Sequence, residues 1–170
     1  MKKMLSLILI LALLVSICGC GQSSEPEMIM PTAFYYHNDL NTKENFNDVF
    51  VAEIREGAQY RNDYTLLLNN YFAGPESENL VNPFPADLEV VSLVTNEDTV
   101  NIVLSDQITK ITSVDLTIAC CCLSFTLFHL LQCNNVQISA ENGLLDNQEK
   151  LFFSQESMLL LDNTLLPTEN

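Results

Sequence analysis

Cysteine and histidine, the side chains best suited to binding zinc, cluster in one part of this chain. Cys122, His129 and Cys133 are seven and four residues apart, which would place them on one face of a helix. Zinc bonds its ligands at about 2.0–2.3 Å, whereas Cys122 would lie about 10 Å along the helix axis from His129. One ion could join His129 to Cys133 without reaching Cys122, so we expect no metal site. The sequence predicts instead a buried, hydrogen-bonded His129.

The same cysteines are poorly placed for disulfides. Cys120, Cys121 and Cys122 are consecutive and would point in different directions on a helix. Cys133 would lie about 20 Å along the helix from Cys120, far beyond the reach of a disulfide. We therefore expect four free, buried thiols that pack as small apolar side chains, and the sequence assigns them no further role.

Groups that take part in catalysis are present, but their surroundings do not favour a reaction. His37, His129 and the pair Ser105-Asp106 lie outside any known nucleophile motif. Catalytic carboxylates need buried settings that shift their pKa values. Three acidic pairs of this chain fall instead in expected loops or at strand ends: Glu76/Glu78, Asp87/Glu89 and Glu97/Asp98. We expect no catalytic residue, no cofactor and no enzyme activity.

The 170-residue chain is strongly acidic, with 7 basic and 22 acidic residues and a formal net charge of −15. Its length favours one domain, and a hydrophobic content of 48% is ample for a core. An acidic surface repels the phosphates of nucleic acids, and no basic patch in the sequence reverses that effect. We therefore expect no nucleic acid partner.

The N-terminal segment has the features of a bacterial export signal. Two lysines precede an apolar stretch over residues 5–17, which has the length of a signal peptide and not of a membrane span. The sequence that follows, Ile17-Cys18-Gly19-Cys20-Gly21, resembles a lipobox. The resemblance implies that Cys20 carries a thioether-linked diacylglycerol, becomes the mature N-terminus and anchors the protein to the membrane on its extracytoplasmic face. An ordinary cleaved leader with a chance cysteine is the alternative.

We therefore expect a lipoprotein signal peptide over residues 1–19, a flexible tether over 20–31, a single domain over 32–162 and a loose tail over 163–170. The domain is organised around a helix, because apolar residues recur at steps of three and four from Leu116 to Leu131. Apolar character extends around much of this helix, which indicates burial. The run is too short for a membrane span. Thr112 and Asp115 are predicted to cap its start.

The remaining elements are predicted from periodicity and turn residues. Alternation predicts strands over residues 32–37, 49–56, 136–141 and 151–154, and a hairpin with arms 88–95 and 99–105. Steps of three and four predict a second helix over residues 60–72, which Ala73-Gly74-Pro75 ends. Loops are expected over residues 38–48 and 76–87.

These elements in this order resemble the GerMN domain, a family named from a bacterial lipoprotein of sporulation and spore germination. The resemblance covers residues 34–162 and rests on Leu66-Leu67-Leu68 before Ala73-Gly74-Pro75, Phe84-Pro85, Val90-Val91-Ser92-Leu93, residues 100–105, Thr126-Leu127, and Val136-Gln137-Ile138 before Asn142-Gly143. Cys120-Cys121-Cys122 and Asn134-Asn135 depart from the family pattern. The resemblance implies an α/β fold, a two-layer sandwich with two helices packed on one face of a mixed sheet, in the αββαβ order of ring-building modules.

The resemblance also implies a function. It indicates a lipid-anchored, non-catalytic module that binds envelope proteins or itself through a strand edge or helix face, with a role in sporulation or spore germination. Tyr35, Tyr36 and Phe84 are expected on the surface of such a module. The alternative is an envelope module that binds a cell-wall polymer or a small ligand through loops 38–48 and 74–87. The acidic charge argues against an anionic polymer.

Overall fold

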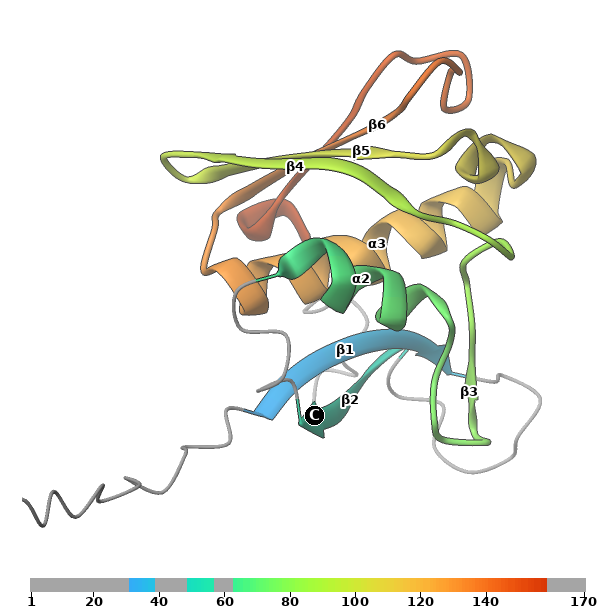
Figure 1. Ribbon diagram of the computed structural model, residues 1–170, viewed down its shortest axis with the longest axis vertical. Helices are drawn as coiled ribbons and strands as arrows, with labels where there is room; N and C mark the ends of the chain where they lie inside the picture. The colour runs from blue at the N-terminus through green and yellow to red at the C-terminus, as the bar shows by residue number, and fades with distance from the viewer. Residues whose placement is uncertain (1–30, 39–48, 57–62, 159–170) are drawn as a thin grey trace, which may run out of the picture.

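Figure 1 shows the computed structural model, which describes residues 31–38, 49–56 and 63–158. The predicted signal peptide, Cys20, nearly all of the tether and of the loop at 38–48, and the C-terminal tail lie outside these residues. The described elements are β1 (Pro31–Asn38), β2 (Phe50–Glu56), α2 (Tyr64–Phe72), β3 (Leu80–Val81), β4 (Val90–Asn96), β5 (Thr99–Leu104), the 3₁₀ helix η2 (Asp106–Lys110), α3 (Ser113–Leu131), β6 (Asn135–Ala140) and β7 (Leu151–Ser154).

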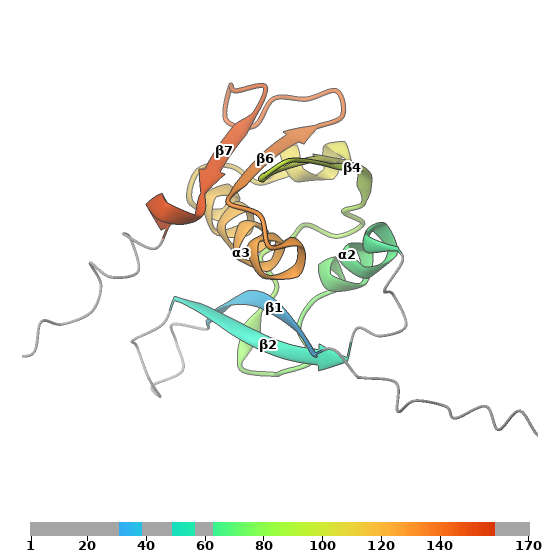
Figure 2. The ribbon, with the colours of Figure 1, turned by 90° about the vertical axis from the view of Figure 1, so that its left-hand side faces the viewer.

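The two helices lie between two sheets (Figures 1 and 2). One sheet has four strands in the order β4-β5-β6-β7, and the other has three strands in the order β2-β1-β3. Helix α2 packs on β4 and α3 packs on β6, so both helices cover one face of the four-stranded sheet. The predicted α/β class, with two helices on one face of a mixed sheet, is confirmed. The three-stranded sheet on the other side of the helices is an addition to the predicted two layers.

The four-stranded sheet contains the predicted hairpin and strands. Strands β4 and β5 are antiparallel, whereas β5 and β6 are parallel because α3 carries the chain back along the sheet. In the parallel pair, Val100 lies beside Val136 and Ile102 beside Ile138, and all four side chains are buried. The residues between them point to the opposite face, as the period of two in a strand requires. The predicted alternation in β5 is therefore confirmed.

Helix α3 is the buried centre of the molecule, as predicted. It packs on both β6 and β1, which explains why apolar residues occur around most of its circumference. By length and composition alone it could cross a membrane. In this fold it forms the core instead, and eight of its side chains are almost completely inaccessible to solvent: Leu116, Ala119, Cys120, Cys122, Leu123, Ser124, Thr126 and Leu127.

Both ends of α3 differ from the prediction. Thr112 is the N-cap residue but makes no capping hydrogen bond through its side chain. The N–H of Ser113 donates instead to Oδ2 of Asp146 at 2.9 Å, a partner from the loop after β6 that no local pattern could indicate. At the other end, Gln132 adopts a left-handed conformation with φ of 51° and stops the helix. Cys133 therefore lies beyond the helix and not on its face.

Helix α2 begins at Tyr64 and not at the predicted Tyr60. Asp63 caps it, because its Oδ1 accepts the N–H of Leu66 at 2.9 Å. Gly74, with φ of 113°, makes the corner that follows the helix. The region after this corner was predicted as a loop, but it contains β3, which pairs with the end of β1.

Two of the three aromatic residues expected on the surface are buried. Tyr36 is 0% exposed and Phe84 is 6% exposed. Both pack around Tyr71 of α2, with ring centroids 5.0 Å and 4.9 Å from the Tyr71 ring. The prediction was wrong because the second sheet turns the face that carries Tyr36 toward α2. Tyr35, on the opposite face of β1, is half-buried.

Candidate functional site

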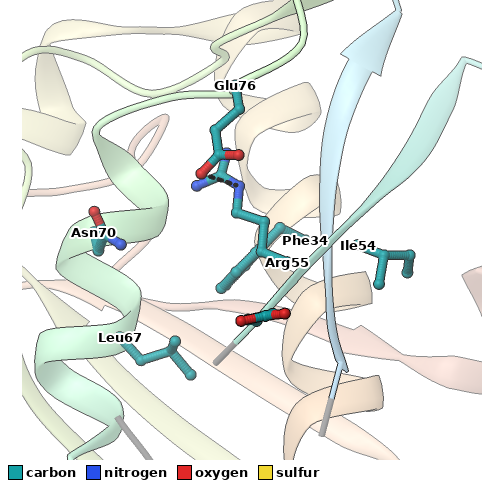
Figure 3. A pocket seen from close by; sticks show the side chains of 7 residues that line it. Phe34, Ile54, Arg55, Leu67, Asn70 and Glu76 are labelled. Atoms are coloured by element: carbon teal, nitrogen blue, oxygen red, sulfur yellow. Dashed lines mark ion pairs between the residues drawn. The ribbon is translucent and has the colours of Figure 1, made fainter. Parts of the chain in front are cut away.

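A pocket of about 350 Å³ opens between α2 and the three-stranded sheet (Figure 3). Its lining combines apolar side chains from both elements with carboxylates and one guanidinium: Phe34, Ile54, Arg55, Glu56, Leu67, Asn70 and Glu76. Figure 3 shows Leu67 and Asn70 on α2, with Leu67 extending from the helix toward the strands. The pocket is large enough to hold a small molecule.

Arg55 is the central side chain of this pocket, and only 9% of it is exposed. One guanidinium nitrogen, Nη2, donates to the hydroxyl of Tyr36 at 3.0 Å and to the carbonyl of Gly74 at 2.8 Å. The guanidinium carbon lies 5.2 Å from the centroid of the Phe34 ring and 5.4 Å from that of Tyr36. A cation at this distance is attracted to the face of an aromatic ring. These contacts hold Arg55 in one position.

Glu53 neutralises Arg55 and joins β2 to the corner after α2. Its carboxylate forms an ion pair with the guanidinium and accepts the N–H groups of Glu76 at 3.0 Å and Ser77 at 2.9 Å. Burial alone raises the pKa of the Glu53 carboxyl, but the N–H groups of Ser77 and Glu76 and the Arg55 guanidinium outweigh burial. The pKa is therefore below its usual value, and the carboxylate stays charged.

The lining of this pocket offers little for a reaction. It contains no serine, cysteine or histidine that could serve as a nucleophile or general base. Glu76 is exposed, and its Oε1 lies 3.8 Å from Nε of Arg55, as the dashed line in Figure 3 marks. Burial raises the pKa of the neighbouring Tyr36 hydroxyl, which therefore stays protonated.

The four thiols are buried, as predicted, and are free in the structure. Burial raises the pKa of Cys120 to about 12 and that of Cys121 to about 11, and it also raises those of Cys122 and Cys133. Since the thiolate is the reactive form, these cysteines are poor nucleophiles and poor metal ligands. Cys133 donates a weak hydrogen bond to the carbonyl of Leu127, with Sγ 3.6 Å from the oxygen.

His129 is exposed, so the prediction of a buried histidine was wrong, although the predicted hydrogen bond is present. Its Nε2 lies 2.8 Å from the hydroxyl of Tyr35, and the two rings stack with centroids 5.3 Å apart. His129 lies in the last turn of α3, beside Tyr35 of β1. The structure does not bring it together with Cys122 and Cys133. Within the described residues, no group of three or more His, Cys, Asp or Glu side chains could hold a metal ion.

Ser105 and Asp106 have structural partners. The Ser105 hydroxyl accepts the N–H of Glu89 at 3.1 Å, and an oxygen of Asp106 accepts the N–H of Asn142 at 2.8 Å. Hydrogen bonds from Asn142 lower the pKa of the Asp106 carboxyl. The pair therefore joins β5 and η2 to neighbouring segments, and neither histidine is among these hydrogen-bond partners.

The Arg55 pocket was not predicted from the sequence. Its lining comes from β1, β2, α2 and the corner after α2, so no local spacing relates the residues. One signal was available, since Arg55 is a rare cation in an acidic chain and lies between Glu53 and Glu56 on a strand. A buried arginine of this kind needs a carboxylate partner.

Together these features define a small mixed α/β domain with its thiols in the core and a pocket beside α2. The family model described as Germane, sporulation and spore germination, matches residues 33–146. The chain belongs to this family, since the match covers more than half of its residues. No match was found among curated proteins.

Solved structures are similar to this domain. The tandem GerMN domains of the sporulation protein GerM from Bacillus subtilis match with a TM-score of 0.50 and 19% identity, over 73% of this chain and 45% of that one. This chain thus spans less than half the length of that structure. At this identity the likeness shows the fold alone, and the GerMN resemblance is confirmed. A proposed lipoprotein from Clostridium perfringens matches with a TM-score of 0.41 and 18% identity, over 75% of this chain and 89% of that one.

Proposed function

We propose that this chain is a lipid-anchored, extracytoplasmic domain that binds envelope proteins, without catalysis, during sporulation or spore germination. The observation that carries the proposal is membership, through residues 33–146, of the family described by these two processes. The location rests on the lipobox-like segment that ends at Cys20. Two acyl chains on this cysteine suffice for stable anchoring.

The positions of the reactive side chains support binding over catalysis. The thiols are buried in the core with raised pKa values, and Arg55 is paired with Glu53. The imidazole of His129 is exposed and is hydrogen-bonded to the hydroxyl of Tyr35. Nucleophilic catalysis needs an activated nucleophile beside a base that a third group orients.

The anchor is tested by substituting each cysteine of the lipobox-like segment in a bacterial host. Cys20→Ser should abolish the diacylglycerol and the processing that depends on it, so the protein keeps the mass of the unprocessed chain. Cys18→Ser is the matched control, because Cys18 lies in the predicted leader, and it should leave the mature mass unchanged. Mass spectrometry of the membrane fraction gives both results. A lipidated mature protein from the Cys20→Ser variant, or wild-type protein free in the cytosol, would contradict the proposal.

The binding role is tested in the native host. Affinity purification of the anchored chain from membranes should recover envelope proteins that the Cys20→Ser variant does not recover. Expression should rise with sporulation, and loss of the chain should reduce the yield of spores or their germination. Constant expression in a host that does not sporulate would remove the sporulation part of the proposal.

Small-ligand or wall-polymer binding is the second candidate, and the pocket beside Arg55 favours the small ligand. The exposed carboxylate of Glu76 at this pocket disfavours an anionic ligand. Retention on purified cell wall in the absence of partner proteins would favour a polymer. A ligand-induced rise in melting temperature, lost in Leu67→Trp, which fills the pocket, would favour a small molecule.

A further inference from the structure

Within the four strands themselves, the face of the sheet that points away from the helices carries no charged side chain. The register places Val94 beside Asn101, Asn101 beside Gln137, and Gln137 beside Phe152, in one row across all four strands. The other residues on this face are also uncharged: Ser92, Asn96, Thr99, Val103, Asn135, Ser139 and Ser154. We call these residues, together with the row, the neutral face.

Carboxylates surround the neutral face, because they occupy the turns at the ends of its strands: Glu89, Glu97, Asp98, Glu141, Glu149 and Glu156. All of these residues are exposed, and one nearby lysine, Lys150, accompanies them. The chain as a whole has a net charge of −15, so the uncharged strand residues contrast with the carboxylates around them. Exposed sheet faces of soluble proteins normally carry charged residues that keep them in solution.

The two ends of the central row are apolar and exposed. Val94 on β4 is 51% exposed, and Phe152 on β7 is 63% exposed. β4 is also an edge strand, and its sequence Val-Val-Ser-Leu-Val-Thr-Asn contains none of the charges or prolines that usually protect an edge from pairing. A centre depleted of charged side chains, with exposed apolar residues near it and a polar rim, is a composition found at protein–protein interfaces.

We propose that the neutral face is the docking surface for a protein partner whose contact surface has an uncharged centre flanked by lysine or arginine. The inference rests on the proposed binding function and names its surface and the chemistry of its partner. Positive flanks complement the carboxylate rim and speed association. A second copy of this chain would place one acidic rim against another, and an anionic polymer would meet the same repulsion. A neutral glycan carries no positive charge that could pair with the carboxylates of the rim.

The first experiment locates the contact. The photo-reactive residue benzoylphenylalanine replaces Phe152 in the full-length, lipidated chain in the native host, where it keeps an exposed aromatic ring at that position. The matched control places it at Leu66, which is 53% exposed on α2, on the helix side of the sheet. We expect a cross-linked protein from Phe152 and none from Leu66, and the cross-linked peptide of the partner should lie beside basic residues.

The second experiment measures binding of that purified partner to the full-length chain in detergent. Asn101→Glu and Gln137→Glu, which place a carboxylate in the neutral face, should each weaken binding by at least about tenfold. Leu66→Glu should leave binding unchanged. Raising the salt concentration should weaken binding of the wild-type chain, because the rim contacts are exposed ion pairs.

The possible outcomes separate this inference from the proposed function. A protein cross-linked from Leu66 and not from Phe152 would overturn the neutral face and leave the binding role intact. Cross-linking from Phe152 to a second copy of the chain, to a glycan or to an acidic surface would overturn the inference, as would an unchanged affinity in Asn101→Glu. The absence of any cross-linked protein from both positions would count against both proposals.

Discussion

The backbone N–H of Tyr35 donates to the hydroxyl oxygen of Thr126 at 2.9 Å, across 91 residues of sequence. The carbonyl of Tyr35 accepts a hydrogen bond from the hydroxyl of Tyr71 in α2. Both backbone groups point away from β2, along the edge of β1 that faces the helices. The side chains of Thr126 in α3 and Tyr71 in α2 therefore form the hydrogen bonds that the backbone at this edge of β1 would otherwise need from a further strand. This is how the second sheet is joined to the core.

Removing the hydroxyl of Thr126 should destabilise the protein. Thr126→Val keeps the shape of the side chain but leaves the N–H of Tyr35 without an acceptor, at a cost of about 1–3 kcal/mol in the free energy of unfolding. Urea denaturation followed by circular dichroism measures the loss. Thr117→Val is the control on the same helix, because the Thr117 hydroxyl is exposed and bonds only to Ser113 one turn earlier. The control should change stability by less than about 0.5 kcal/mol; equal effects would contradict the role of Thr126.

The lowered pKa of Glu53 predicts a loss of stability in acid. A carboxyl whose pKa is lower in the folded than in the unfolded state stabilises the fold above the unfolded value, here 4.5, and that contribution is lost as the pH falls through the folded value. Glu53→Gln should lower the free energy of unfolding at pH 7 by about 1–3 kcal/mol. It should also flatten the dependence on pH below 4.5. Urea denaturation at several pH values tests this, with exposed Glu78→Gln as a control that should follow the wild type.

The raised pKa values of the cysteines predict slow reaction with thiol reagents in the folded protein. At pH 8 the thiolate fraction of Cys120 and Cys121 is small, because burial raises their pKa values to about 12 and about 11. Labelling with a chromogenic disulfide reagent should be at least about tenfold slower in the folded protein than in urea. In urea, without a reductant, the mature lipidated protein should release the reporter from all four thiols, Cys120, Cys121, Cys122 and Cys133. A smaller number would indicate a disulfide, and a fifth would indicate that Cys20 is unmodified.

Loss of the Asp146 side chain should loosen the start of α3. Asp146→Gly removes the acceptor for the N–H of Ser113, and glycine adopts the φ of 45° at this position without strain. We expect a loss of about 0.5–2 kcal/mol, as for other N-terminal caps. Asp146→Asn keeps an acceptor oxygen and should lose less. Hydrogen exchange should be faster in the first turn of α3 in Asp146→Gly than in the wild type. An unchanged exchange rate in this turn would contradict the role of Asp146.

Much of the fold follows from local patterns. The apolar run of α3, the alternation in β5 and β6, and the corner at Gly74 each depend on neighbouring residues, and each prediction is confirmed within a few positions. The burial of Cys120, Cys121 and Cys122 followed from the same helix pattern, whereas Cys133 is buried beyond the end of the helix. Element boundaries were less well predicted, because caps such as Asp146 come from distant segments.

Other predictions failed where a side chain depends on long-range packing. Tyr36 and Phe84 have no local feature that distinguishes buried from exposed aromatics, and both are buried only because the second sheet closes over α2. The side chain of His129 was expected to be buried because its helix is apolar around most of its circumference. Its position in the last turn leaves it exposed. The Arg55 pocket gathers residues from separate elements, and no spacing in the sequence relates them.

Composition and periodicity indicated an acidic chain with a buried helix, and the resemblances to a lipobox and to the GerMN family implied a lipobox-like start and a mixed α/β domain. These properties depend on residues close together in sequence, whose hydrophobic pattern selects their local structure. The contacts between β1 and the helices, the pairing of Arg55 with Glu53, and the separation of charge between the neutral face and its rim were decided by the fold. They depend on which segments meet in space, and that choice is made by the packing of the whole core.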